Sequence, residues 1–163
     1  MNSKVGMITF FCLMMISSSF SKIQVLSFAA LDKHKLHDQE ALNEKLGHAP
    51  QFAVDHSVQV NPFATHDWVK EGDDLVWRIN VHADRAVSLN FAFTRFRMSE
   101  NSQVSIYSSD LSERIRPFTA RDNNVHNELW TPVLYHESAI IELRVPSQEF
   151  DQVEFELGQV NQG

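Results

Sequence analysis

The sequence predicts a mainly β fold, an antiparallel, jelly-roll-like β-sandwich that follows a short N-terminal helical leader. Two observations support this prediction. Apolar and polar residues alternate along much of the chain after Asp74, and a period of two is the signature of a strand with one buried face. Short polar turns separate the alternating segments, and no helical pattern lies between them. This spacing is typical of a sandwich and not of a parallel sheet with crossover helices.

The first 21 residues have the layout of a secretory signal peptide. A basic start precedes an apolar run of about 12 residues, 5–16, and Ser19 and Ser21 then offer the small side chains that signal peptidase prefers. The run is shorter than the roughly 20 residues that cross a bilayer. We therefore expect cleavage after Ser21, export to the periplasm or the medium, and no membrane span afterwards. Cleavage would remove Cys12, the single cysteine, so neither a disulfide nor a cysteine-ligated metal is expected.

Residues 22–49 differ in composition from the rest of the chain. The segments 27–36 and 37–46 are rich in good helix formers, and Gly47 stands where a helix would stop. This pattern predicts a short helical leader. The β-sandwich domain is then expected over residues 50–163, with a possible first strand at 57–60. Its further strands are predicted at residues 75–82, 86–96, 103–108, 113–118, 138–145 and 152–160.

The strand at 86–96 gives the clearest period of two. Val87, Leu89, Phe91 and Phe93 fall on one face, which predicts that all four are buried. The polar link at 83–85 is short enough for a hairpin between this strand and the one before it. At the other end of the domain, Pro146 is expected to end a strand because proline cannot donate a hydrogen bond to the ladder.

Catalytic motifs are missing from the sequence. None of the five glycines flanks a serine in the way that a nucleophile elbow needs, and none forms a phosphate-binding loop. Among eight histidines, His34 and His37 are three residues apart and would share a helix face, but no third zinc ligand stands near them. We therefore predict no catalytic residues and no metal ligands of this kind, and we interpret the histidines as surface residues.

Two further hypotheses concern ligands. Loop carboxylates could hold calcium, although their spacing matches no defined motif; they are Asp73, Asp74, Asp110, Glu113, Asp122 and Glu128. Trp130 and Tyr135 lie in predicted loops and could contact a ligand by stacking, whereas Trp77 within a strand is expected in the core and Trp68 at one end of it. The net charge of −7, without a cluster of lysine and arginine, argues against nucleic acid as a partner.

Several segments, in order, resemble a known family. They are residues 26–32 (LSFAALD), 75–79 (LVWRI), 86–91 (AVSLNF), 105–108 (SIYS), 129–133 (LWTPV), 140–146 (IIELRVP) and 159–163 (QVNQG). Their order and spacing are similar to the N-terminal region of secreted bacterial trypsin-like serine endopeptidases of the lysyl endopeptidase type. The resemblance covers almost all of the chain after the signal peptide and rests on the order of the segments.

The resemblance implies a non-catalytic pro-region or accessory domain. In that family a helical leader and a β-sandwich precede the protease domain, and this sequence stops at Gly163, where the protease domain would be about to begin. The implied role is folding, inhibition or substrate docking of a serine protease domain, in cis or in trans. The alternative is a secreted module that binds a polysaccharide or another ligand of the cell envelope. An independent enzyme would need a catalytic constellation that the sequence does not offer.

Overall fold

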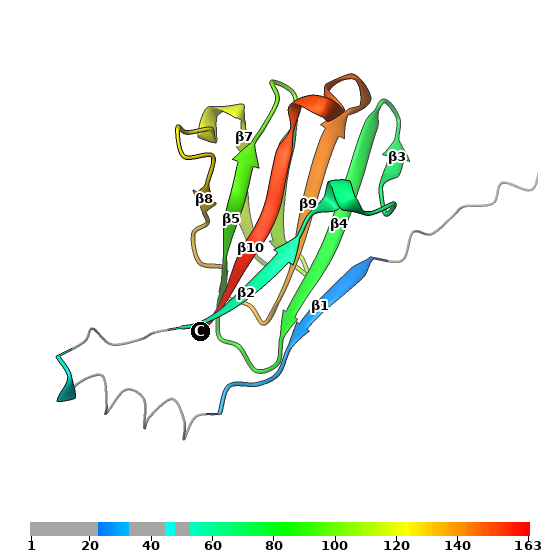
Figure 1. Ribbon diagram of the computed structural model, residues 1–163. Coiled ribbons are helices and arrows are strands. Elements are labelled where there is room, and N and C mark those ends of the chain that lie inside the picture. The colour runs from blue at the N-terminus through cyan, green and yellow to red at the C-terminus, as the bar shows by residue number, and fades with distance from the viewer. Residues whose placement is uncertain (1–22, 33–44, 48–52) are drawn as a thin grey trace, which may run out of the picture.

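Two β-sheets packed face to face form the protein in the computed structural model, which describes residues 23–32, 45–47 and 53–163 (Figure 1). The six-stranded sheet has the order β1-β4-β9-β6-β7, with β3 also paired to β4. Its strands are β1 (Gln24–Phe28), β3 (Val69–Glu71), β4 (Asp74–Ala83), β6 (Gln103–Ser108), β7 (Arg114–Thr119) and β9 (Ser138–Pro146).

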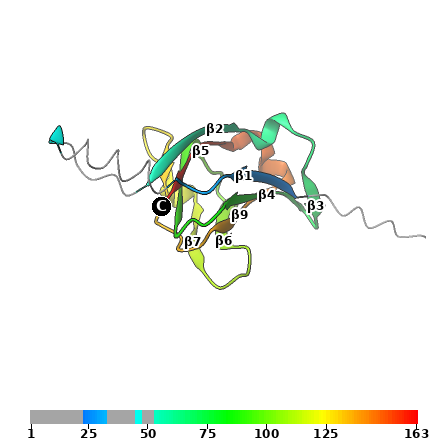
Figure 2. The same ribbon diagram turned by 90° about the horizontal axis from the view of Figure 1, so that it is seen from below.

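The second sheet has four antiparallel strands in the order β2-β10-β5-β8. They are β2 (Val54–Val60), β5 (Leu89–Arg97), β8 (Leu129–Trp130) and β10 (Glu154–Gln162). Three short 3-10 helices lie in the connections: η1 (Pro62–Ala64), η2 (Ala120–Asp122) and η3 (Ser147–Gln152). The two layers are seen end-on in Figure 2, where β1 and β2 lie on the same side of the sandwich.

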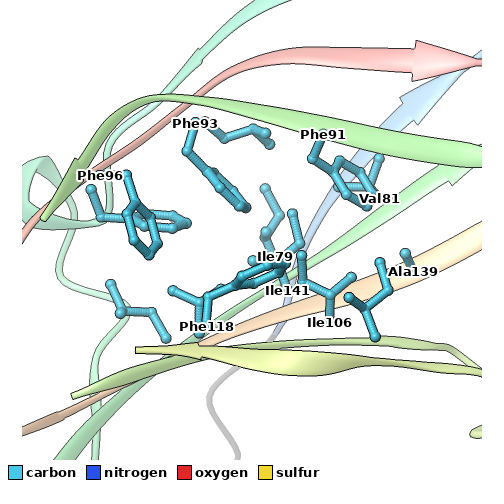
Figure 3. Packing of buried hydrophobic residues seen from close by; sticks show 14 of the residues in the cluster. Ile79, Val81, Phe91, Phe93, Phe96, Ile106, Phe118, Ala139 and Ile141 are labelled. Atoms are coloured by element: carbon cyan, nitrogen blue, oxygen red, sulfur yellow. The ribbon is translucent and has the colours of Figure 1, made fainter. Parts of the chain in front are cut away.

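The core lies between the two sheets, as alternating strands require. Phe91, Phe93 and Phe96 project from β5 toward Ile79 and Ile141 of the opposite sheet (Figure 3), and all five side chains are almost completely buried. Trp77 is also fully buried, which confirms its predicted place in the core, and its ring meets that of Phe155 edge-on at 6.3 Å. Trp68 packs against the rings of Phe63 and Phe150 at the border of this core, as predicted.

The prediction of a helical leader over residues 22–49 is wrong for residues 24–28, which form a strand. Residues 24–28 form β1, which runs parallel to β4 and makes the six-stranded sheet mixed instead of antiparallel. Leu26 and Phe28 alternate with exposed neighbours and pack against the core. Burial of these two side chains outweighs the helix-forming composition of the segment, because propensity is a weak preference compared with tertiary packing. The remaining leader residues 33–44 and 48–52 lie outside the described residues.

Two predictions at the start of β5 are also wrong. The strand begins at Leu89, and Val87 is 72% exposed instead of buried. Its backbone N–H donates to the carbonyl oxygen of Gly163 at 2.7 Å, so Val87 stays outside the strand and points to solvent. The link at 83–85 makes no hairpin, because it carries the chain from β4 in one sheet to β5 in the other. The possible first strand at 57–60 is β2, which begins three residues earlier, at Val54. The other predicted strands agree with the structure to within two residues, and β9 ends at Pro146 as expected.

Candidate functional site

The aromatic side chains predicted to contact a ligand are both exposed. Trp130 is 58% exposed and Tyr135 is 70% exposed. Trp130 belongs to the short edge strand β8 and pairs with Ala92 of β5, so it is on a strand and not in a loop as expected. Because directly opposed residues of an antiparallel pair share a face, the indole lies on the outer face of the four-stranded sheet.

The backbone that carries these two aromatic residues is held firmly along β5. Thr131 donates its backbone N–H to the Phe91 carbonyl, and its hydroxyl accepts from the Phe91 N–H, both at 2.9 Å. Leu89 and Leu134 exchange two backbone hydrogen bonds of 2.8 Å, and the Leu134 side chain is fully buried. Rigid elements hold binding side chains more precisely than free loops do. The exposed rings are therefore presented at low conformational cost.

Two further exposed apolar side chains lie on the neighbouring backbone segments. Val133 is 44% exposed and Val87 is 72% exposed, and the pairing of Leu89 with Leu134 brings the segments of both residues to one edge. We call Val87, Trp130, Val133 and Tyr135 the apolar edge. Gly163 lies beside it, since its carbonyl accepts hydrogen bonds from Val87 and Ser88. Sequence reasoning found the two aromatic residues but missed the valines, because Val87 was assigned to the buried face of a strand.

Serine, histidine and aspartate come together near the turn between β6 and β7, but not in a catalytic order. The Asp110 carboxylate accepts from the hydroxyls of Ser108 and Ser112, each at 2.7 Å. His136 Nε2 lies 3.5 Å from Asp110, while its Nδ1 lies within 3.0 Å of the backbone of Ser138. A triad needs the histidine between the serine and the acid. Here the acid contacts the serines directly, and their hydroxyls lower the pKa of Asp110, so the cluster holds a turn.

The loop carboxylates considered for calcium are dispersed. Asp74 pairs with Arg144 at 3.4 Å, and Asp122 pairs with Arg116 in the capping box of η2, which lowers the Asp122 pKa. No group of three or more histidine, cysteine, aspartate or glutamate side chains that could hold a metal ion occurs in the part of the chain that the structure describes. The predicted histidine pair, His34 and His37, lies outside the described residues.

An ion network crosses the outer face of the six-stranded sheet. Arg78 donates to Glu142 at 2.7 Å and to Glu71 at 2.9 Å, and Arg144 donates to Glu71 at 2.8 Å. The Tyr107 hydroxyl donates to Glu142 at 3.2 Å. These groups link β3, β4, β9 and β6, and the hydrogen bonds from Arg78 and Arg144 lower the pKa of Glu71. Because each of its charges already has a partner, we assign the network a structural role.

We expect the ion network to make the stability of the fold depend on pH. A carboxylate with a lowered pKa stabilises the fold above its ordinary value of 4.5, and this contribution is lost as the pH falls through the lower folded-state pKa. Glu71→Gln should therefore lower the denaturation midpoint at neutral pH, and the difference from wild type should shrink toward pH 3. Urea titrations across this range, with the exposed Glu100→Gln as control, measure the effect. An undiminished difference at low pH would show that Glu71 acts through packing alone.

No known protein-family profile matches the chain. Within the described residues, no helix has both the length and the apolar composition that crossing a membrane requires. The structure thus defines the class of the protein as a mainly β domain of two packed sheets.

Proposed function

We propose that the chain is a non-catalytic accessory domain of an exported trypsin-like serine endopeptidase of the lysyl endopeptidase type. It assists the folding of a protease domain, inhibits it or docks its substrates, and it does so by binding through the apolar edge. The proposal includes export to the periplasm or the medium. It rests on the resemblance of the ordered sequence segments to the N-terminal region of that family, and on the surface described above.

The observation that favours the apolar edge as a binding surface is that two exposed aromatic side chains stand on a backbone held by hydrogen bonds. Aromatic residues that are exposed and well positioned are enriched at the centres of protein interfaces. Trp130 and Tyr135 fit this description, since the hydrogen bonds of Thr131 and Leu134 fix the backbone between them. Gly163 lies beside Val87. In the family that the sequence resembles, the protease domain follows this position, so a domain joined there would lie near the apolar edge.

Binding of a protease domain should depend on the two aromatic rings. We expect Trp130→Ala together with Tyr135→Ala to weaken binding by a hundredfold or more, since each hot-spot ring contributes about 2 kcal/mol or more. The measurement is a titration of the chain with the catalytic domain of a lysyl endopeptidase from the same genome, read by calorimetry. Leu111→Ala, which removes another side chain that is 65% exposed, is the matched control. Equal affinities for the double variant and the control would contradict the proposed surface.

A second candidate is the binding of a polysaccharide. Trp130 borders the outer face of the four-stranded sheet, where Thr94 and Gln159 offer a hydroxyl and an amide group, and this combination suits stacking on a sugar ring with hydrogen bonds to its hydroxyls. Trp130→Ala alone should then abolish retention of the chain on insoluble polysaccharide, and Tyr135→Ala should reduce it. Soluble oligosaccharides should compete for retention but not for the protease domain, which separates the two candidates.

A further inference from the structure

The edge strand β1 carries no charged residue or proline that would hinder pairing with a further strand. β1 ends the six-stranded sheet on the side where β2 ends the other sheet, and Figure 2 shows the two strands on that side. One edge of β1 pairs with β4. Its other edge pairs with no strand in the described part of the chain, so it presents free backbone N–H and C=O groups.

The other edge strands carry the features that natural proteins use against unwanted pairing. β7 contains Arg114, Arg116 and Pro117, β3 contains Lys70 and Glu71, β2 contains an exposed aspartate at position 55, and β8 has two residues. Charges, proline and short length all discourage the addition of a further strand. β1, with the sequence QVLSF, has five residues and neither a charge nor a proline. It is the described edge best suited to accept a strand.

The exposed face of β1 is apolar. Val25 is 57% exposed, and Ile23, directly before the strand, is 41% exposed. Both belong to the side of β1 that faces solvent, since Leu26 and Phe28 face the core. The end of the strand is fixed: Phe28 stacks on His56 with ring centroids 4.3 Å apart, and the Phe28 carbonyl accepts from the Asp84 N–H at 3.0 Å. An added strand would therefore meet a rigid template with an apolar surface.

A hollow of about 340 Å³ begins at the first residue of β1. It is lined by Gln24, by Gln59 and Val60 at the end of β2, by residues Asn61, Ala64 and Thr65 around η1, and by Glu156 of β10. The side-chain amides of Gln24 and Gln59 make no hydrogen bond among the described residues. Glu156 accepts from the Thr94 hydroxyl at 3.3 Å but has no cationic partner in the part of the chain described. The hollow thus combines unused amide groups with one carboxylate that lacks a counter-charge.

We propose that the free edge of β1 binds an extended basic peptide, which adds a strand to the six-stranded sheet. Backbone hydrogen bonds to β1 would supply affinity for an extended chain, as in other cases of strand addition. Apolar residues at alternate positions of the peptide would cover Val25 and Ile23. A lysine or arginine of the peptide would reach the hollow and pair with Glu156. The net charge of −7 on the chain favours a basic peptide over a second copy of the chain, which carries the same charge.

This site lies on the side of the sandwich where β2 ends the four-stranded sheet, opposite the β8 edge that carries Trp130, and it does not rest on the proposed function. Its test needs no protease. The probe is a short fluorescent peptide in which lysine and valine alternate, and the same peptide with glutamate in place of lysine is the charge control. We expect saturable binding of the basic peptide, little binding of the acidic one, and slower amide hydrogen exchange of residues 24–28 in the complex.

Two variants with the same change of charge test the position of the site. Val25→Lys places a charge on the free strand, whereas Val125→Lys places it on a side chain that is 91% exposed between η2 and β8. Val25→Lys should weaken peptide binding by about tenfold or more, and Val125→Lys should leave it within about twofold. Glu156→Gln should weaken binding and reduce its dependence on salt.

Three results would overturn the proposal. The first is equal weakening by Val25→Lys and Val125→Lys, which would show that the peptide responds only to overall charge. The second is binding without slower exchange of residues 24–28. The third is self-association of the chain in sedimentation velocity that Val25→Lys abolishes, which would make a second copy the occupant of this edge.

Discussion

Replacing Trp77 by alanine should lower the free energy of unfolding by about 3–5 kcal/mol, the cost typical of deleting a buried tryptophan side chain. Trp77 is fully buried in β4, where it contacts the ring of Phe155 from the opposite sheet. The deletion would leave a cavity between the sheets that the paired strands cannot close. Its indole Nε1 also has no hydrogen-bond partner among the residues that the structure describes. Trp77→Phe should therefore cost less, because it removes this unsatisfied donor and leaves a smaller cavity.

Trp130→Ala is the matched control for the effect at Trp77, because the same substitution is made at an exposed position. Trp130 is 58% exposed, so its loss should change stability by no more than about 0.5 kcal/mol. Urea denaturation followed by far-ultraviolet circular dichroism measures all three variants without relying on tryptophan fluorescence. Similar losses for Trp77→Ala and Trp130→Ala would contradict the assignment of Trp77 to the core.

Gly158→Ala should lower the free energy of unfolding by about 1–3 kcal/mol, as overpacking usually does. A Cβ atom added at Gly158 in β10 would lie 2.2 Å from Thr94 Cγ2 and 2.9 Å from Thr94 Cβ in β5. Rotation of the threonine side chain moves Cγ2 but not Cβ, so the two strands themselves must separate. The pairing of β10 with β5 shifts register next to this glycine, and the glycine permits that close approach.

The double variant Gly158→Ala, Thr94→Gly tests the cause of this loss. Removing the threonine side chain removes the three heavy atoms nearest to the new methyl group, so the double variant should be more stable than the sum of the two single effects predicts. We expect a coupling of about 1–2 kcal/mol between the two positions. Additive effects would show that the alanine acts on the backbone conformation of Gly158 and not through contact with Thr94.

The alternation of apolar and polar residues was sufficient to predict most of the sandwich. It located β4, β6, β7, β9 and β10 to within two residues, because each has one face on the core and so carries the period of two in its own sequence. The same reasoning placed Trp77 in the core. The pattern does not encode which strands share a sheet. For this reason the link at 83–85 resembled a hairpin, although it joins the two layers.

β1 could not be predicted from local sequence. Its five residues are followed by strong helix formers, and the signal for a strand comes from distant partners, namely the parallel ladder with β4 and the stacking of Phe28 on His56. β8 escaped prediction for a related reason, since two residues are too few to show a period. Val87 illustrates the opposite error: it matches the period of β5 but lies before the strand, where its backbone bonds to Gly163.

The candidate site was predicted in part. Trp130 and Tyr135 were predicted as ligand contacts because they lie in predicted loops, and both side chains are exposed, although Trp130 belongs to β8. Their role in binding stays a prediction. The extent of the apolar edge depends on the pairing of Leu89 with Leu134, a contact between residues far apart in the sequence. The unprotected edge of β1 could not have been recognised at all before the strand itself was known.

Hydrogen–deuterium exchange of the chain with and without the catalytic domain of a lysyl endopeptidase tests the central claim most directly. The claim is that a serine protease domain binds through the apolar edge. We predict slower exchange of the backbone amides that remain free along residues 129–135 and at Val87, with residues 24–28 unchanged. Slower exchange only in other segments, or no change in exchange at a large molar excess of the protease domain, would contradict this claim.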